Sequence, residues 1–520
     1  MRPNPHRRRD HLDVAVEPAE EPHPGRAQPA IGVVDERRGH SPSLPATDRS
    51  AHASRRVDWY AGAGPVAGQT ARPAAPPRFR RQRRSCPVRP RRVRAPGPTS
   101  PLESGERDPC NLTPTSTKTN IRTVLRKSTN VRSGCVPTVG VIGGGQLARM
   151  MVPAAVALGC RLKILSGEPD VSASGFAELV TGDWRDPCVT TRFAQGCDVI
   201  TFEHELVPDD VYPALERSGV PTLPLPTTMR NASNKVTQRE LARAAGLQVA
   251  DHEVVSDAAE LANAVDRFGL PLVAKRISGG YDGRGLTWLR SADDIDRMGA
   301  SLAGDPVLIE PELSIDAELA VTVARRRNGE HLTYPVVRTF QEDGICRSVI
   351  APARIHPHHA RSLTAAAVTI ADQLDHVGVI TVEAFLVDDE LYLNELAPRP
   401  HNSAHYTIDA CTTSQFENHL RAVLDLPLGD ASMVVPAAAM ANVIAAGEQA
   451  VWPSDVELPP RTSIHLYAKR YRPGRKVGHV TVTGHDPTAI ERIATAIADK
   501  LSSPGERSDD PVGSPKGASA

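Results

Sequence analysis

Two glutamates in the second half of the chain have the spacing of a paired carboxylate site. Residues 379–387 and 391–396 are strand-like runs around an acidic turn, which is typical of a short β-hairpin. With the turn centred on Asp389, Glu383 and Glu395 face each other across the strands, roughly 5 Å apart. Two uncompensated carboxylates repel, so either one is protonated or a cation lies between them. Mg²⁺, which prefers carboxylate, phosphate and water oxygens, fits such a pair.

A glycine-rich segment, residues 270–285, has the composition of a phosphate-binding loop. An apolar run predicts a strand that ends at Lys275, and four glycines follow at positions 279, 280, 283 and 285. Such a loop brings backbone N–H groups close to phosphate, and the lysine adds a positive charge. No Gly-Lys-Ser/Thr sequence follows, so the segment is not a P-loop. Together the two segments indicate a site for a nucleotide, a divalent cation and a small anionic substrate.

The N-terminal quarter of the chain differs from the remainder in composition. Residues 1–135 contain 26 Lys+Arg against 12 Asp+Glu and 19 of the 46 prolines, which leaves 35 against 49 charges for the remainder. A segment so poor in apolar residues cannot bury a core, and we expect a disordered Arg/Pro-rich extension. The arginine-rich run 78–94 could bind a nucleic-acid backbone, but it lacks interleaved aromatic residues. Early acidic residues argue against a transit peptide.

The spacing of the cysteines and the length of the apolar runs limit which compartment and partners are expected. The eight cysteines include no Cys-x-x-Cys pair and no His/Cys spacing typical of zinc sites. This pattern favours a reduced, cytoplasmic protein without structural zinc. The histidines at 356–359 are predicted to cap a helix at 360–374. No apolar run is long enough for a membrane span, so neither a membrane nor a nucleic acid is expected as a partner.

The remaining sequence predicts three folded units. Residues 136–232 show an α/β pattern, in which Gly143, Gly145 and Ala148 fit the G-x-G-x-x-G/A dinucleotide fingerprint after a strand. An NAD-linked oxidoreductase is therefore an alternative on this stretch alone. Residues 233–428 change to an α+β pattern with antiparallel hairpins, residues 429–501 predict a small C-terminal β-rich domain, and residues 502–520 a disordered tail.

Seven motifs occur along residues 136–501 in the order found in one enzyme family. They are GGGQLARM, NKVTQRELA, AKRISGGYDGRG, DGICRSVIAPA, NELAPRPHNSAH, SQFENHLRAVLDLPL and RPGRKVGH. The chain therefore resembles the ATP-grasp enzymes, and within them the N5-carboxyaminoimidazole ribonucleotide synthases of purine biosynthesis. The resemblance implies an ATP-grasp architecture: a Rossmann-like pre-ATP-grasp domain at 136–232, an ATP-grasp domain at 233–428 and a small C-terminal domain at 429–501.

The resemblance also implies a reaction. ATP phosphorylates bicarbonate to carboxyphosphate, which releases CO₂ beside the exocyclic amine of 5-aminoimidazole ribonucleotide. Because carboxyphosphate decomposes in water, the glycine-rich loop is expected to be a lid as well as a phosphate cradle. The family further implies Mg²⁺ or Mn²⁺, a homodimer and a functional link to a downstream mutase. A sister ATP-grasp enzyme that uses formate would lack the combination of GGYDGR and RPGRKVGH.

Carried over residue by residue, the resemblance assigns four overlapping sets. The metal carboxylates are Glu383 and Glu395. ATP would contact Lys235, Lys275, Gly280, Tyr281, Asp282, Gly283, Arg284, Gly285, Leu286, Glu310, Pro311, Glu312, Leu313, Glu318, Asn394 and Glu395. The ribonucleotide would contact Tyr281, Asp282, Arg284, Asn402, Lys469, Arg475 and Lys476, and catalysis would fall to Asp282, Arg284, Arg399, His401 and Lys469. The chain departs from the family's common residues at Leu286, Pro311 and Gln341, which leaves individual ATP contacts open.

Overall fold

A computed structural model gives the fold of residues 136–169, 171–279, 285–302, 304–342, 344–450 and 456–502. The predicted N-terminal extension, the tail after residue 502 and the loop residues Gly280, Tyr281, Asp282, Gly283 and Arg284 lie outside the described residues. Every helix and strand described below belongs to the part of the chain after residue 135.

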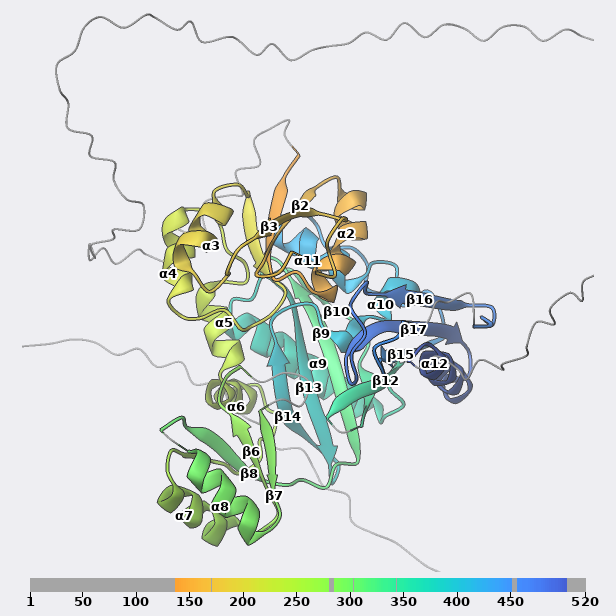
Figure 1. The fold of residues 1–520 in the computed structure, drawn as a ribbon. Helices are drawn as coiled ribbons and strands as arrows, with labels where there is room; N and C mark the ends of the chain where they lie inside the picture. The colour runs from red at the N-terminus through yellow and green to blue at the C-terminus, as the bar shows by residue number, and fades with distance from the viewer. Residues whose placement is uncertain are drawn as a thin grey trace, which may run out of the picture. The chain divides into compact units, whose positions relative to one another are not determined.

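The described chain begins with a four-stranded parallel sheet whose order is β3-β2-β1-β4 (Figure 1). Its strands are β1 (Thr138–Ile142), β2 (Arg161–Ser166), β3 (Glu178–Thr181) and β4 (Val199–Phe202). The connecting helices are α2 (Gln146–Leu158), α3 (Pro187–Ala194) and α4 (Val211–Ser218). All residues of β1 and β4 are buried, which explains why these strands are continuous apolar runs. The prediction of a Rossmann-like α/β start is confirmed.

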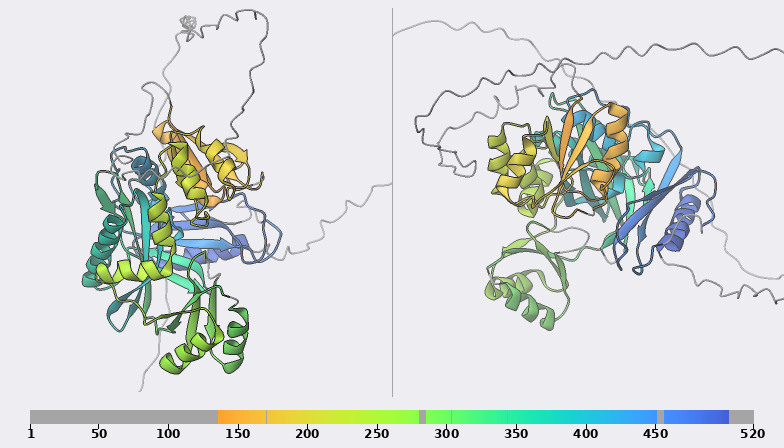
Figure 2. Two further views of the ribbon diagram at one scale, coloured as in Figure 1. Left: turned by 90° about the vertical axis from the view of Figure 1, so that its left-hand side faces the viewer. Right: turned by 45° about the horizontal axis from the view of Figure 1, so that its top comes forward.

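A second, smaller sheet is antiparallel and has the order β5-β8-β6-β7. It comprises β5 (Glu253–Val255), β6 (Leu272–Arg276), β7 (Leu286–Leu289) and β8 (Val307–Pro311). Two helices, α7 (Ala258–Phe268) and α8 (Ala292–Ser301), pack on one face, as Figure 2 shows in green. Asp257 accepts hydrogen bonds from two N–H groups at the start of α7, and Ser291 forms a capping box with Asp294 at the start of α8. The unit has an apolar core of its own.

The largest sheet has nine strands, in the order β14-β13-β9-β11-β12-β15-β17-β16, and β10 pairs with β9. The strands are β9 (Ala317–Arg325), β10 (His331–Thr333), β11 (Val337–Glu342), β12 (Ile345–Ala351), β13 (Gly378–Val387), β14 (Glu390–Ala397), β15 (Ala437–Ile444), β16 (Thr462–Leu466) and β17 (Lys476–Gly484). Strand β15, which follows the predicted domain boundary at residue 429, pairs with β12, which precedes it. The ATP-grasp and C-terminal segments therefore share one sheet.

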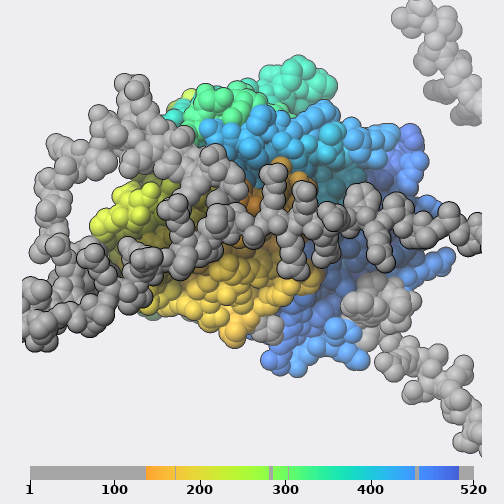
Figure 3. Space-filling view, turned by 90° about the horizontal axis from the view of Figure 1, so that it is seen from above, coloured from red at the N-terminus to blue at the C-terminus, as the bar shows by residue number. Residues whose placement is uncertain are grey.

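Helices cover this sheet and connect it to the first one. They are α5 (Pro226–Ser233), α6 (Lys235–Ala244), α9 (Pro357–Gln373), η1 (Asn402–Ala404), α10 (Thr407–Ala410), α11 (Gln415–Val423) and α12 (Pro487–Ser502). Helix α9 is capped by His356, as predicted, and packs on β9 and β13, while α12 packs on β15 and β17. Leu147 of α2 shares a core with Phe416 and Leu420 of α11. Seen from above, the atoms of the four-stranded parallel sheet and its helices adjoin those of the α11 region (Figure 3).

Two further features concern the described part of the chain. It contains no helix with the length and apolarity that a membrane crossing requires. Cys160, Cys197 and Cys411 are free thiols.

Candidate active site

A cavity of about 720 Å³ is lined by residues of the small and the large sheet and by loops that follow strands of the first sheet. Its walls are the loops after β1 and β4, the strands β6 to β8 of the small sheet, and β13 and β14 of the large sheet. Lys469 and Lys476, which precede and begin β17, also line it. The cavity therefore collects side chains that are more than three hundred residues apart in sequence, and the predicted carboxylate pair lies on its wall.

The two carboxylates face each other as predicted, although for a different reason. Strands β13 and β14 are joined by a two-residue turn at Asp388 and Asp389, both with positive φ, so the turn is not centred on Asp389. Regular pairing from this turn would place Asn394 opposite Glu383. A one-residue register shift between Glu383 and Ala384 instead pairs Glu383 with Glu395. Such a bulge turns neighbouring side chains to one side, and both Asn394 and Glu395 line the cavity.

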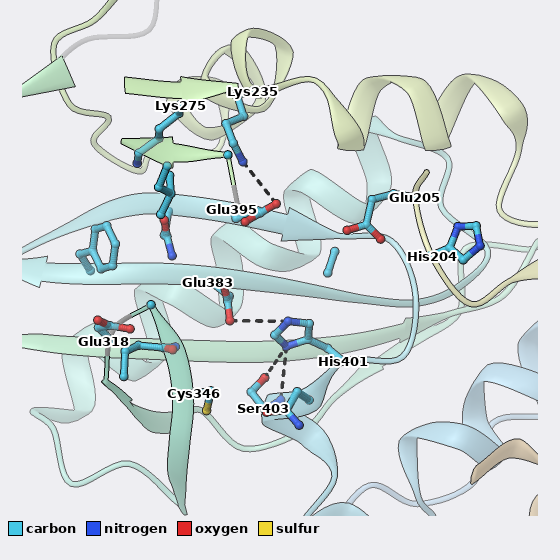
Figure 4. A pocket seen from close by; sticks show the side chains of 18 of the residues that line it. His204, Glu205, Lys235, Lys275, Glu318, Cys346, Glu383, Glu395, His401 and Ser403 are labelled. Atoms are coloured by element: carbon cyan, nitrogen blue, oxygen red, sulfur yellow. Dashed lines mark hydrogen bonds and ion pairs between the residues drawn. The ribbon is translucent and has the colours of Figure 1, made fainter. Parts of the chain in front are cut away.

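Each carboxylate of the pair has one nearby nitrogen partner (Figure 4). Lys235 Nζ lies 3.3 Å from Glu395 Oε1, and His401 Nε2 lies 3.6 Å from Glu383 Oε1. Burial, and then the charges of Glu395 and Glu318, raise the pKa of Glu383 to about 8. Without a cation, Glu383 is therefore mainly protonated at neutral pH, and a bound cation would favour its ionised form. Two carboxylates and the Asn394 amide are hard oxygen donors, so the residues fit a divalent cation such as Mg²⁺.

The predicted phosphate-binding lysine belongs to a buried triad of charges. Lys275 Nζ and Arg239 Nη2 both form ion pairs with the carboxylate of Glu310, the second at 2.5 Å. Burial lowers the pKa of Lys275, while Glu310 acts in the opposite direction. Burial alone would raise the pKa of Glu310, but Lys275 and Arg239 bring it below its ordinary value. Lys275 is therefore fixed at the cavity wall by an acid that Arg239 helps to keep ionised.

The loop after β4 contributes two acidic residues that the sequence prediction omitted. Glu205 forms a two-point ion pair with Arg399, with Nε to Oε2 at 2.5 Å and Nη2 to Oε1 at 3.0 Å. Glu203 accepts hydrogen bonds from the backbone N–H groups of Gly145 at 2.6 Å and Leu147 at 3.1 Å. The position of Glu203 and Glu205 directly after β4 could have identified them as site residues, because ligands of α/β sheets bind at the carboxyl ends of the parallel strands.

The capping by Glu203 bears on the dinucleotide alternative. A pyrophosphate would bind at the N-terminus of α2, where the helix dipole and free N–H groups attract an anion. That place is taken by the Glu203 carboxylate, and even a Cβ atom on Gly145 would collide with it. The glycines of this loop therefore make room for an internal acid, and the NAD alternative loses its structural basis.

His401 is held in place by a residue outside the cavity. The fully buried Gln415 accepts a hydrogen bond from His401 N at 2.8 Å and donates one to His401 O at 2.7 Å. The Nδ1 atom of His401 lies 2.9 Å from Ser403 Oγ, which leaves Nε2 directed toward Glu383 (Figure 4). Both the backbone and the ring of His401 are thus oriented before any ligand binds.

Most of the predicted site residues in the described part of the chain line this one cavity. They are Lys235, Lys275, Gly285, Leu286, Glu310, Pro311, Glu312, Leu313, Glu318, Glu383, Asn394, Glu395, Arg399, His401, Asn402, Lys469 and Lys476. Arg475 is not among the lining residues, and its side chain donates to the backbone oxygen of Arg470 at 3.2 Å. Burial raises the pKa of Glu318, which is hydrogen-bonded to Gln341 at one of the positions that depart from the family.

Comparisons with known proteins agree with this geometry. Three protein-family models match consecutive parts of the chain: the ribonucleotide synthetase preATP-grasp domain at residues 136–233, the ATP-grasp domain at 240–416 and the phosphoribosylaminoimidazole carboxylase C-terminal domain at 438–493. The N5-carboxyaminoimidazole ribonucleotide synthase of Mycobacterium tuberculosis H37Rv is 42% identical over 404 residues, which cover 74% of this chain and 94% of that protein. The chain belongs to the N5-carboxyaminoimidazole ribonucleotide synthase family.

Solved structures of this family of ATP-grasp ligases have the same fold. The Aspergillus clavatus carboxyaminoimidazole ribonucleotide synthase in complex with ATP is 36% identical, with a TM-score of 0.64 over 70% of this chain and 99% of that one. The enzyme from the same organism in complex with ADP and 5-aminoimidazole ribonucleotide is 35% identical, with a TM-score of 0.62 over the same shares of the two chains. The predicted family and its three-part architecture are therefore confirmed.

Proposed function

We propose that this chain uses ATP and bicarbonate to carboxylate the exocyclic amine of 5-aminoimidazole ribonucleotide in purine biosynthesis. One observation carries the proposal: the Glu383–Glu395 pair, two lysines suited to phosphate and a separate basic wall at Lys469 surround a single cavity. Membership of the family and the ribonucleotide-bound relative support this choice of substrate.

The ATP end of the cavity lies between the small sheet and the β13–β14 hairpin. Lys275 and Lys235 would bind the phosphates as point charges, and the segment from Glu310 to Leu313 with Glu318 would meet the nucleoside. Glu383 and Glu395 would hold Mg²⁺ or Mn²⁺, which when bound neutralises charge on the phosphates. Lys235 lies within 3.3 Å of Glu395, so the residue that contacts phosphate also reaches the metal-binding acid.

The chemistry needs two transfers in one closed space. A bicarbonate oxygen attacks the γ-phosphorus of ATP, the bond to the β-phosphate oxygen breaks, and ADP leaves. The C–O bond of carboxyphosphate then breaks, giving CO₂ and inorganic phosphate. The ribonucleotide amine attacks CO₂ and loses a proton, which forms the N5 carbamate. Arg399 and His401, oriented by Glu205 and Gln415, would hold the bicarbonate-derived group between the two substrates.

The ribonucleotide would bind at the wall made by Lys469, Lys476 and Asn402. Two lysines suit its 5′-phosphate, and Lys469 is already held at the cavity by a hydrogen bond to Gln146. Tyr281, Asp282 and Arg284, which would complete the set, lie outside the described residues and enter on the family pattern. A homodimer, a cytoplasmic location and a functional link to a downstream mutase also belong to the proposal.

The test is ADP release by the full chain in the presence of an ATP–metal complex. Turnover should require bicarbonate together with 5-aminoimidazole ribonucleotide and should not occur with formate and glycinamide ribonucleotide. Turnover with the formate pair alone would assign the chain to the sister reaction instead. Release of ADP without any acceptor would show that the site only hydrolyses ATP.

A further inference from the structure

Three side chains with metal-binding atoms meet outside the ATP cavity, where the C-terminal strands approach α10. Asp409 of α10, His465 of β16 and His479 of β17 each offer one ligand atom, and these atoms lie within 4.8 Å of one another. His465 and His479 are directly opposite in the β16–β17 ladder, and their rings stack with centroids 4.5 Å apart. None of the three lines the ATP cavity.

One hydrogen bond already joins two of these groups. His465 Nε2 lies 2.9 Å from Asp409 Oδ2, and the two side chains are 27% and 16% exposed. The third group is deeper, because His479 is fully buried. The trio therefore consists of two partly exposed side chains, Asp409 and His465, and one fully buried imidazole. An ion could reach it from solvent through the exposed pair.

The buried imidazole has a nitrogen that nothing in the described protein uses. His479 Nδ1 lies 2.8 Å from the hydroxyl of Tyr467, whereas Nε2 is buried and has no hydrogen-bond partner among the described residues. Polar atoms in the interior are normally paired, so an unused nitrogen needs an explanation. When Nδ1–H donates to Tyr467, Nε2 carries a lone pair, and this is how metal-bound histidines are usually oriented by a second hydrogen bond.

The donor atoms of this trio indicate the class of ion that they would bind. Two imidazoles and one carboxylate differ from the oxygen donors of the Glu383–Glu395 site. Imidazole suits zinc and its neighbours, whereas Mg²⁺ prefers oxygen.

We propose that Asp409, His465 and His479 bind a divalent transition-metal ion of the zinc class, with water in the fourth position. The three ligand atoms must each come to about 2.0–2.2 Å from the ion. Asp409 and His465 are already in contact, and the three ligand atoms, now within 4.8 Å of one another, must move closer together around the ion. The hydrogen bond between His465 and Asp409 is then replaced by two bonds to the metal.

The position of this site gives it a structural consequence. Strand β17 begins at Lys476, which lines the ATP cavity, and α10 follows shortly after His401. A metal ion would tie the strands that present the basic wall to the segment that follows His401. In the described protein, the hydrogen bond between His465 and Asp409 already links these two segments.

The experiment compares zinc binding by the full chain with that of near-isosteric variants. Protein stripped with a chelator is titrated with zinc chloride alone, and retained zinc is measured by mass spectrometry after dialysis. Wild type should hold one zinc ion that Asp409→Asn and His465→Gln lose, and thermal unfolding should shift upward with zinc in wild type only. Tyr467→Phe should weaken zinc binding by about 10- to 100-fold, since it removes the partner of His479.

Two controls keep the outcome decisive. His485→Gln changes an exposed histidine of the same unit and should retain the zinc ion and the thermal shift. Glu395→Gln should also retain them, because the proposed site is separate from the carboxylate pair. Equal zinc binding by wild type, Asp409→Asn and His465→Gln would overturn the proposal, and so would a wild-type chain that retains no zinc. Circular dichroism of each variant shows that the comparison is between folded proteins.

Discussion

Glu383 and Glu395 lie opposite each other because Asn394 is an extra residue in β14. Pairing from Val387–Glu390 to Ala384–Leu393 is regular, and the register then shifts by one residue at Glu383. The bulge places Asn394 and Glu395 together on the cavity wall, where a regular strand would point them to opposite faces. The strongest electrostatic feature of the site therefore depends on one irregular residue.

Replacing Glu395 with Gln should abolish metal-dependent ATP turnover in a chain that still folds. The substitution removes a metal ligand and also removes a charge that raises the pKa of Glu383. We expect ADP release to fall by at least about 100-fold, as when a charge-stabilising group is lost from an active site. Two effects on the free energy of unfolding in urea oppose each other, because the substitution relieves the repulsion between Glu395 and Glu383 and also removes the ion pair with the buried Lys235. Glu390→Gln, at the exposed start of β14, is the control and should retain full turnover.

The buried triad predicts that substitutions of Glu310 and Glu312, two residues apart, lower the free energy of unfolding by very different amounts. Glu310→Gln leaves Lys275 and Arg239 as buried cations with a weakened partner, which should cost about 3–5 kcal/mol of unfolding free energy. Glu312→Gln breaks an ion pair with Arg290, whose side chain is 62% exposed, and should cost less than about 1 kcal/mol. Urea denaturation of both variants measures the difference. Equal losses would mean that Glu310 is not a structural acid.

Gln415 should affect turnover through His401. Gln415→Leu releases both backbone hydrogen bonds to His401, so we expect kcat to fall by about 10-fold or more while the KM for ATP changes little. Thr407→Val is the matched control, because it removes the hydrogen bond to Gln415 N and leaves His401 held. A kcat for Gln415→Leu that matches the kcat of the control would show that Gln415 only supports the fold.

Lys469 and Arg475 should differ in their effect on the ribonucleotide. Lys469 lines the cavity, whereas Arg475 does not. Loss of a charge-assisted hydrogen bond to phosphate costs about 1.5–3 kcal/mol, so Lys469→Ala should raise the KM for 5-aminoimidazole ribonucleotide by about 10- to 100-fold. Arg475→Ala should change it much less. The reverse order in steady-state assays would move the phosphate site toward Arg475.

Buried histidines predict that stability decreases in mild acid. Burial lowers the pKa of His376 and of His419 to about 3, below the value near 6.5 expected in the unfolded chain. The unfolded chain therefore binds more protons between pH 6.5 and 3, and stability is lost as the pH falls through this range. At pH 5 each of the two histidines should lower the free energy of unfolding by about 2 kcal/mol relative to pH 7. His376→Phe should reduce the difference in unfolding free energy between these pH values by about that amount.

Features that depend on consecutive residues could be predicted from the sequence. The hairpin, the strand that ends at Lys275 and the order of the motifs predicted the architecture and most of the residues that line the cavity. The same local pattern placed the turn at Asp389 and missed the bulge, since nothing in the alternation of β14 signals an extra residue. The two errors cancelled at Glu383 and Glu395.

Long-range partners could not be predicted from one sequence. Glu205 reaches Arg399 and Arg239 reaches Glu310 only after the sheets assemble. The three groups of the proposed zinc site come from α10, β16 and β17, so a search for local His/Cys spacing finds no structural zinc. Such sets have no signature in spacing, because the fold and not the chain order brings them together.

The origin of the oxygen atoms in the released phosphate tests the central claim most directly. If bicarbonate attacks ATP, one bicarbonate oxygen stays on phosphorus when the C–O bond of carboxyphosphate breaks. With freshly dissolved ¹⁸O-labelled bicarbonate, ATP and 5-aminoimidazole ribonucleotide, mass spectrometry should find one labelled oxygen in the inorganic phosphate. Phosphate without label, in a reaction that still releases ADP, would show that water attacks ATP and would contradict the account.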